Sequence, residues 1–396
     1  MPRTPDDVHR SVRQAVADRA DALWDVALRL HADPEPAFAE HRAAALLTGE
    51  LERAGFEVEH GVAGMPTAFI ARSGGHRPTV ALLMEYDALP GLGHACGHNL
   101  IAAAGLGAAL ALRAVPEASA GTVLAVGTPA EEGGGGKVLE VEAGVFDGVD
   151  AALMFHPGVY DWARAPLTAQ VQYRVAFHGR AAHPTGNPTE GVDALAALVE
   201  LFNVLGVLGR RLPEGSHVQG IVTHGGTATN IVPDHAEGRF GLRAATTGAL
   251  EELAERLRVC ADGIALATGT TAEVERATVR YEHFRDSAPL SERFAAHLSR
   301  SGIRLTPPEP GVYLGSSDVG NVSTRLPAIH PFVAITGPEK SDHTPEFAEA
   351  AASPRAREVL LAVTAALACT AVDVLLSPGL REEAWRRHQE GNGGRD

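Results

Sequence analysis

A buried strand, a loop rich in polar side chains and an apolar helix follow one another between Thr79 and Leu112, and this segment constrains the fold most. Thr79–Met84 is an apolar run of the length of one buried strand, and the alanine-rich run Leu100–Leu112 predicts a helix. The loop Glu85–Asn99 between them carries two acids, two histidines and one cysteine among three glycines. Because loops at the carboxyl ends of strands in α/β sheets commonly bind ligands, the segment predicts an α/β protein with a ligand site here.

The composition indicates a globular, acidic protein. The 396 residues suggest two domains, and the 45% of hydrophobic residues suffices for sizeable cores. Lys and Arg total 34 against 49 Asp and Glu, so the formal charge of −15 argues against a nucleic-acid partner. Three cysteines are too few for a disulfide framework, and residues 1–7 lack an apolar signal core, so we expect a cytoplasmic protein. The longest apolar run, Val359–Val372, is shorter than a membrane span and predicts a buried helix and no membrane partner.

Strands alternate with helices in the first 169 residues and again after residue 286. Apolar residues at helical spacing predict helices in Asp6–Leu30 and Glu40–Ala54. Further predicted elements are strands at Phe56–Val58, Thr67–Ala71, Gly121–Gly127, Val149–Phe155 and Phe332–Thr336, and a helix at Pro354–Leu375. This alternation predicts a mostly parallel sheet flanked by helices.

The pattern changes between residues 170 and 286. Gln170–Phe177 alternates polar and apolar residues, as a strand with one face in water does. The following predicted elements are a helix (Gly191–Leu208), two strands (His217–His224 and Ala236–Arg243), a helix (Leu250–Thr268) and a strand (Ala272–Tyr281). This βαββαβ order is that of the split, ferredoxin-like arrangement. We therefore expect an inserted α+β domain at residues 170–286 within an α/β domain formed by residues 1–169 and 287–396.

Residues able to bind metal ions follow four of the strands predicted for the α/β domain. Cys96 and His98 lie in the first loop, and the other three exits lead to Glu132, His156 and His343. If the sheet is parallel, these exits lie at one edge. A catalytic zinc typically has three protein ligands and one open position, so five ligands can serve two ions if one ligand or a hydroxide bridges them. The set therefore predicts a two-metal site.

Two adjacent glutamates supply one ligand and one base in this hypothesis. Adjacent residues of an extended chain point apart, so Glu132 can bind metal while Glu131 accepts the proton of the attacking water. The chemistry alone leaves these two roles interchangeable. Each residue by itself has an ordinary explanation, since a histidine before Pro-Gly, such as His156, is usually a turn residue, but their coincidence at four exits favours a metal site. Gly133–Gly136 followed by Lys137 resembles a phosphate-binding loop but lacks its first glycine and its Ser or Thr.

Motifs along the whole chain resemble those of a known enzyme family. They are Leu30–Glu35, Glu85–Leu100, Pro129–Gly136, Phe155–Pro157, Gly179–His183, Asn230–Pro233, Ser317–Ser323, Ile329–Pro331 and His343–Thr344. With them the chain resembles the two-metal amidohydrolases of the aminoacylase and carboxypeptidase-G superfamily, metallopeptidase family twenty. Within that superfamily it is similar to the branch of p-aminobenzoyl-glutamate hydrolase and β-alanyl-lysine (Xaa-Arg) dipeptidase.

The resemblance implies a fold, a metal site and a second set of functional residues. It implies a zinc-exopeptidase-like α/β fold in which residues 170–286 form a lid and the contact of a homodimer. It implies that the five residues named above bind two divalent ions, zinc or manganese, with the first of the two glutamates as base. On the lid, His183 would polarise the scissile carbonyl with support from Asn230, and Arg243 would bind a substrate carboxylate bidentately. Asp87 would orient a ligand histidine.

Three hypotheses for the function follow from these residues. The first is hydrolysis of an amide that joins an acyl or aminoacyl group to an amino acid, with an N-acyl amino acid or a dipeptide as substrate. The second is a related aminohydrolase that acts on an aromatic amine or amidine. The third is a metal-free binding protein that has the same fold, and such a protein has no need of a base such as Glu131.

Overall fold

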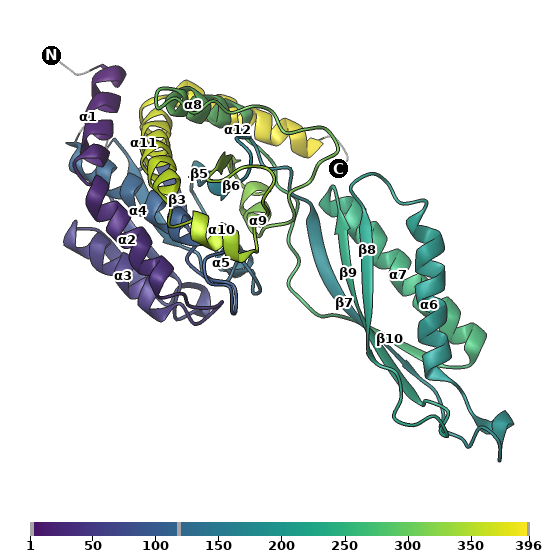
Figure 1. The fold of residues 1–396 in the computed structure, drawn as a ribbon. Helices are drawn as coiled ribbons and strands as arrows, with labels where there is room; N and C mark the ends of the chain where they lie inside the picture. The colour runs from purple at the N-terminus through teal and green to yellow at the C-terminus, as the bar shows by residue number, and fades with distance from the viewer. Residues whose placement is uncertain (1–3, 117–119, 394–396) are drawn as a thin grey trace. The chain divides into compact units, whose positions relative to one another are not determined.

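The structure is a computed structural model that describes residues 4–116 and 120–393 (Figure 1). The chain forms two compact units, and the second is inserted into the first. The first unit comprises the chain up to Pro166, Phe284–Val312 and the part from Asp318 onward; the second comprises Leu167–His283 and Tyr313–Ser317.

The segment Tyr313–Ser317 belongs to the second unit, whereas the sequence analysis assigns it to the α/β domain. The N–H and the hydroxyl of Thr168 donate to the carbonyl of Gly315 at 2.9 and 3.1 Å. The hydroxyl of Ser316 lies 2.8 Å from that of Thr168 and accepts a hydrogen bond from Arg243 at 2.7 Å. Thr168 and Gly315 are 147 positions apart in the sequence, so no local sequence pattern predicts their contact.

The first unit is built on a six-stranded sheet in the order β1-β2-β4-β3-β5-β11. The strands are β1 (Glu57–His60), β2 (Phe69–Ser73), β3 (Thr79–Met84), β4 (Thr122–Gly127), β5 (Ala151–Leu153) and β11 (Ala328–Ile329). β4, β3, β5 and β11 run parallel to one another, while β2 pairs antiparallel with β4 and β1 pairs antiparallel with β2. The predicted mostly parallel sheet is confirmed, and its parallel strands direct their carboxyl ends to one edge.

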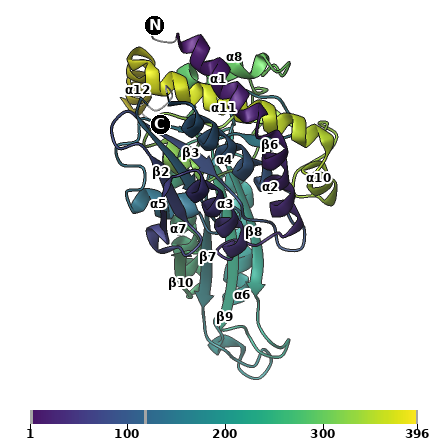
Figure 2. The ribbon, with the colours of Figure 1, turned by 90° about the vertical axis from the view of Figure 1, so that its left-hand side faces the viewer.

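Helices pack against this sheet and against one another (Figure 2). They are α1 (Pro5–Ala17), α2 (Ala20–Ala32), α3 (His41–Arg53), α4 (His98–Ala114), α5 (Gly136–Glu142), α8 (Ala288–Ser299), α9 (Val319–Ser323), α10 (Pro345–Ala350), α11 (Pro354–Leu376) and α12 (Pro378–Gly393). α4 is buried along almost its whole length, in contact with β3, α1, α2 and α11. A Cβ at Gly105 would lie 2.6 Å from Cγ of Met84, so glycine permits this close approach of α4 to the central strand.

Two predicted elements differ from the structure. Asp6–Leu30 forms two helices rather than one, because the chain leaves helical geometry at Arg19 (φ −107°, ψ 6°). The first helix, α1, packs against α11 and α4, whereas α2 packs mainly against α4. The strand predicted at Phe332–Thr336 is β12 (Phe332–Ala334), which pairs with β6 (His156–Gly158) in a separate two-stranded sheet. The place expected for it in the main sheet is taken by β11, which is too short to give a periodic signal.

The second unit is a four-stranded antiparallel sheet in the order β10-β7-β9-β8. Its elements are β7 (Ala169–His178), α6 (Ala194–Gly209), β8 (His217–His224), β9 (His235–Ala244), α7 (Thr247–Thr268) and β10 (Thr271–Arg276). Both helices pack apolar side chains, such as Leu198 and Leu253, against sheet residues such as Val175 and Phe240. The predicted βαββαβ order and the ferredoxin-like α+β architecture are confirmed.

α11 is the long apolar helix of the first unit. By length and composition it could cross a membrane, yet 78% of its most apolar window is buried inside the structure. It packs against α1, α4 and α8. Near its end, Oδ2 of Asp373 lies 2.8 Å from Nε2 of His297 on α8, and Oδ1 lies 2.9 Å from Nε2 of His9 on α1. One carboxylate thus joins three helices.

The carboxylate of Asp373 should make the stability of the first unit depend on pH. Although burial raises its pKa, the neighbouring His297 and His9 lower it from the ordinary 3.8 to about 2. A carboxyl group whose pKa is lowered on folding stabilises the fold above its unfolded pKa, and this contribution is lost as the pH falls through the folded pKa. We therefore expect Asp373→Asn to lower the free energy of unfolding by about 2 kcal/mol at neutral pH.

Urea unfolding at a series of pH values measures this effect. The difference between wild type and Asp373→Asn should shrink as the pH falls from about 4 to about 2. Asp262→Asn, at an exposed position of α7, is the matched control and should change the free energy of unfolding little at any pH. A difference for Asp373→Asn that stays constant over the pH range would contradict the prediction.

Candidate metal centre

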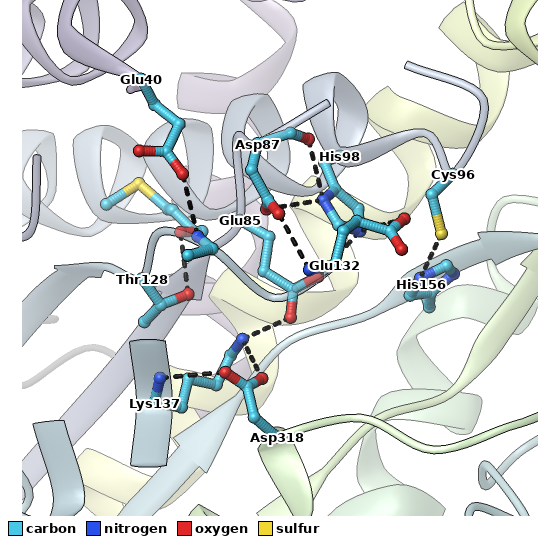
Figure 3. Close-up of polar contacts among 12 residues, drawn as sticks. Glu40, Glu85, Asp87, Cys96, His98, Thr128, Glu132, Lys137, His156 and Asp318 are labelled. Carbon is cyan, nitrogen blue, oxygen red and sulfur yellow. Dashed lines mark hydrogen bonds and ion pairs between the residues drawn. The ribbon is translucent and has the colours of Figure 1, made fainter. Parts of the chain in front are cut away.

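Cys96 and His98 come together through a tight turn that also reaches His156. Gly97 between them has φ +75°, which favours glycine, and a Cβ there would lie 2.4 Å from Cγ of Pro157. The ligand atoms of Cys96, His98 and His156 lie within 4.8 Å of one another, and Sγ of Cys96 is 3.5 Å from Nε2 of His156 (Figure 3). All three side chains are buried.

A second group of three residues shares Cys96 with the first. Its other members are Glu132, after β4, and His343, after β12, and the ligand atoms of this group also lie within 4.8 Å of one another. The N–H of His343 donates to the carbonyl of Ala95 at 2.9 Å, which joins its loop to that of Cys96. Nε2 of His343 lies 3.4 Å from Oε1 of Glu132, and the His343 side chain is 51% exposed. The two groups together contain all five predicted ligands.

His98 is oriented as histidine ligands of metal ions usually are. Its Nδ1 lies 3.0 Å from both the side chain and the backbone oxygen of Asp87, so a hydrogen on Nδ1 leaves the lone pair on Nε2. Nε2 is buried and makes no hydrogen bond within the described residues; it lies 3.5 Å from Oε2 of Glu85 and 3.9 Å from Oε1 of Glu132. A buried nitrogen lone pair without a donor is costly, and carboxylates lie beside it, so this set of ligand atoms fits a cation. Asp87 lies where the sequence analysis expects a residue that orients a ligand.

The surroundings of the Cys96 thiol also indicate a cation site. Burial raises its pKa well above the usual range, and the nearby Glu132 raises it further. A thiolate at this position therefore needs positive charge beside it, and a divalent ion that the thiolate coordinates supplies that charge. Thiolate and imidazole ligands suit zinc and related transition metals.

Glu131 is adjacent to Glu132, and a carboxylate oxygen of Glu131 lies within 4.8 Å of ligand atoms of His98 and Glu132, but two further acids also lie near it. A carboxylate oxygen of buried Glu131 lies within 4.8 Å of carboxylate oxygens of Glu85 and Asp318. Fully buried Lys137 joins these two acids, because its Nζ lies 2.5 Å from Glu85 and 2.7 Å from Asp318 (Figure 3). Burial, together with the charges of Glu85 and Asp318, raises the pKa of Glu131 well above its usual range.

The amino-acid sequence does not predict the buried cluster of Glu85, Lys137 and Asp318. From its sequence context, Lys137 resembles only a residue of a phosphate-binding loop, and the two acids belong to longer motifs. An acid directly after the apolar strand Thr79–Met84 is the one local signal, because a charge at such a position needs a partner. The partner could not be named, since the residues that meet come from three distant segments.

The remaining predicted residues lie in the second unit. His183 is exposed, and its Nδ1 accepts the backbone N–H groups of the residues two and three positions later at 3.2 and 3.0 Å. Nε2 therefore carries the hydrogen. Asn230 is exposed in the connection between β8 and β9, and Arg243 on β9 donates to the hydroxyl of Ser316 at 2.7 Å.

Comparison with known proteins decides the family. A family model described as peptidase family M20/M25/M40 matches residues 81–366, which is most of the chain and includes every residue of the metal centre described above. The chain belongs to this family. The resemblance found from the sequence motifs is thereby confirmed.

Individual members of the family are similar to nearly the whole chain. Xaa-Arg dipeptidase of Mus musculus is 37% identical over 394 residues, which cover 94% of this chain and 90% of the relative. One of the subunits of p-aminobenzoyl-glutamate hydrolase from Escherichia coli strain K12 is 31% identical over 459 residues, with coverages of 97% and 94%. The crystal structure of a dinuclear metal-binding M20 peptidase from Bacillus subtilis has a TM-score of 0.73 over 91% of this chain and 99% of that one, at 24% identity, which confirms the fold. Membership of this family makes the chain a hydrolase of amide or peptide bonds.

Lys137 provides the positive charge on which two buried acids of this family member depend. We expect Lys137→Met to lower the free energy of unfolding by about 3–5 kcal/mol, because it leaves Glu85 and Asp318 buried without their cation. The double variant Lys137→Met/Asp318→Asn should regain part of this loss, since it removes one of the unpaired charges. Denaturant unfolding in the presence of a chelator measures both, with Lys340→Met at an exposed position as control. A loss in Lys137→Met no larger than in the control would contradict the prediction.

Proposed function

We propose that this family member is a metal-dependent hydrolase that cleaves the amide bond between an acyl or aminoacyl group and an amino acid. Two divalent ions, zinc or manganese, would be held by Cys96, His98, Glu132, His156 and His343. The observation that carries the proposal is that these side chains form two groups of three that share Cys96. Three protein ligands and one open position for each ion is the arrangement of catalytic zinc sites, and the thiol and imidazole ligands favour zinc.

Cys96 would take part in holding both ions in this proposal, because it belongs to both groups of three. Cys96, His98 and His156 would hold one ion, and Cys96, Glu132 and His343 would hold the other. A thiolate ligand requires a reduced cysteine, and the three cysteines of the chain are free thiols. This supports the cytoplasmic location that we also propose.

The relatives support the substrate class. The names Xaa-Arg dipeptidase and p-aminobenzoyl-glutamate hydrolase both describe an amide whose nitrogen belongs to an amino acid. The Bacillus subtilis relative in fold is described as a dinuclear metal-binding peptidase. We therefore expect an N-acyl amino acid or a dipeptide as the substrate of this chain.

Glu131 would move the proton during hydrolysis. Bound divalent ions supply a Lewis acid that polarises the scissile carbonyl and lowers the pKa of water. Glu131 would accept a proton from the attacking water and pass it to the amide nitrogen as the C–N bond breaks. It suits this role because its carboxylate lies beside Glu132 yet outside both groups that share Cys96, and because its surroundings raise its pKa.

The second unit would contribute groups that bind the substrate. Nε2–H of His183 would donate to the scissile carbonyl oxygen, with Asn230 in support, because the backbone contacts at Nδ1 leave this nitrogen as the donor. Arg243 would bind the carboxylate of the substrate. Its observed partner is the neutral hydroxyl of Ser316, and within the described residues it forms no ion pair, so its charge is available to an anion.

A homodimer through the second unit is part of the proposal. β8 is the last strand of its sheet and exposes Ile221 (59%) and Val222 (51%), while α6 exposes Val199, Val204 and Val207. Exposed strand edges and apolar patches are normally covered in soluble proteins. Pairing of β8 with the same strand of a second chain about a two-fold axis would cover both.

The two adjacent glutamates should give opposite phenotypes. Glu131→Ala should keep two metal ions per chain and lose turnover by about two to four orders of magnitude, as expected for a general base. Glu132→Ala should instead lose bound metal, because a ligand is removed. Elemental analysis of the purified variants and a hydrolysis assay on N-acyl amino acids and on Xaa-Arg and β-alanyl dipeptides measure the two properties.

Glu142→Ala is the control for this pair, because Glu142 is exposed at the end of α5. If the phenotypes of Glu131→Ala and Glu132→Ala are exchanged, the roles of ligand and base are reversed. If wild-type protein binds less than one ion per chain after metal addition, a binding protein without catalysis replaces the proposal. If it binds two ions but hydrolyses only aromatic amines or amidines, the substrate class is wrong.

The proposed dimer leads us to expect that His183 serves the metal centre of the partner chain. Mixing the two inactive variants Glu131→Ala and His183→Ala under conditions of subunit exchange tests this. If His183 acts in trans, a mixed dimer has one site that lacks both groups and one intact site, so activity returns. No activity after exchange verified by mass spectrometry would show that each chain uses its own His183.

A further inference from the structure

The loop that carries Glu131 and Glu132 begins with a residue in a disfavoured backbone conformation. Ala130 has φ +60°, in the left-handed region that residues with a side chain rarely adopt. Its carbonyl accepts the N–H groups of Gly134 and Gly135 at 2.9 and 2.8 Å, so the turn that follows the two glutamates starts from this residue. Such a conformation persists only where the surrounding structure holds it.

Glu40 holds Ala130 in this conformation. Glu40 is fully buried immediately before α3, and its Oε1 accepts the N–H groups of Ala130 and Phe38, each at 2.9 Å. Its Oε2 accepts the hydroxyl of Thr67 at 2.8 Å. Phe38 also has a positive φ, of 63°, so one carboxylate fixes two residues in the left-handed region.

A second buried carboxylate holds the other side of Glu131. Oδ2 of Asp87 accepts the N–H of Glu132 at 2.9 Å, while Oδ1 of Asp87 lies 3.0 Å from Nδ1 of His98. Glu131 therefore lies between two backbone N–H groups, those of Ala130 and Glu132, and each is held by a buried acid from a different part of the chain. Figure 3 shows the contact of Asp87 with Glu132.

The ring of Phe38 packs on the same loop. A Cβ at Gly134 would lie 2.2 Å from that ring, so Phe38 occupies the space that a side chain at this position would need. Glu40, Phe38 and the turn from Ala130 to Gly135 thus form one packed assembly. The assembly contains no member of the two groups that share Cys96, apart from Glu132 within the turn itself.

We propose that Glu40 is a positioning residue for catalysis, which fixes the direction in which Glu131 presents its carboxylate to the attacking water. The proposal rests on the proposed role of Glu131 as the base. Glu40 acts through the backbone N–H of Ala130, so its side chain must be long enough to place an acceptor oxygen at hydrogen-bond distance from this N–H. A neutral amide oxygen at the same reach can accept the same two N–H groups, whereas a carboxylate on a shorter side chain cannot reach both.

Two substitutions distinguish the effect of the length of the Glu40 side chain from the effect of its charge. Glu40→Gln keeps the reach and removes the charge, and it should retain kcat within about threefold of wild type. Glu40→Asp keeps the charge and shortens the side chain by one methylene, and it should lower kcat by about 100-fold, because a displacement of about 1 Å at a reacting group has an effect of this size. KM and metal content should stay within about twofold in both variants, since substrate groups and metal ligands are untouched.

Thr67→Val is the matched control for this pair. It removes the hydroxyl that donates to Oε2 of Glu40 but leaves the two N–H contacts of Oε1, so it should retain kcat while it lowers thermal stability. A purely structural role for Glu40 would instead lower thermal stability in every variant without the split between kcat and KM. Equal kcat values for Glu40→Gln and Glu40→Asp would overturn the proposal.

Hydrogen exchange of the wild-type protein tests the proposal without any variant. The amide hydrogen of Ala130 should exchange at least about 100-fold more slowly than in a free peptide, because it is hydrogen-bonded to a buried carboxylate. Rapid exchange at Ala130 would overturn the proposal even if Glu40→Asp does not fold. Failure of the proposed function has a different signature, because Glu131→Ala would then keep its activity whatever the Glu40 variants do.

Discussion

The first unit depends on the placement of buried negative charge at the carboxyl edge of its parallel strands. An isolated carboxylate in a protein interior is very costly, and it persists only with hydrogen-bond donors or cations beside it. Each acid at this edge meets that need differently: backbone N–H groups surround Glu40, His98 and a backbone N–H contact Asp87, and Lys137 joins Glu85 to Asp318. A thiolate at Cys96 and the carboxylate of Glu132 would need a cation in the same way, which supports the divalent metal ions that we propose there.

Two carboxylates next to each other in sequence have different neighbours, and this supports the different roles that we propose for them. Glu132 faces Cys96 and His343, groups that can share a cation with it. Glu131 faces Glu85 and Asp318, whose negative charges and the burial around them raise its pKa and favour its proton-accepting role. The separation requires that the backbone between them does not rotate. Buried acids on both sides of Glu131 provide that rigidity, in keeping with the general need to support reactive groups from behind.

The candidate functional groups of the second unit differ from those of the first in their exposure to solvent. Its predicted functional groups, His183, Asn230 and Arg243, are exposed, and none of them lies in a buried network of acids. Rigid burial suits residues that hold metal ions in fixed positions. Exposed groups on an antiparallel sheet suit a surface that binds a substrate or a second chain, where one face of each strand remains in water.

Elements with a strong period, and the candidate ligands that directly follow them, could be named from the amino-acid sequence without any structure. Runs such as Thr79–Met84 and the alternating Gln170–Phe177 indicate the parallel sheet and the inserted unit, because burial of one or both faces of a strand leaves a periodic trace. Cys96, His98 and His156 could be named because strand ends of a parallel sheet share one edge. Only the tertiary structure shows that Cys96 belongs to both candidate metal groups, that Glu131 lies near Glu85, and that β12 pairs with β6 outside the main sheet. The roles of Lys137 and Glu40 also depend on it, since their partners lie in distant segments and hydrogen bonds between such segments leave no local pattern in the chain.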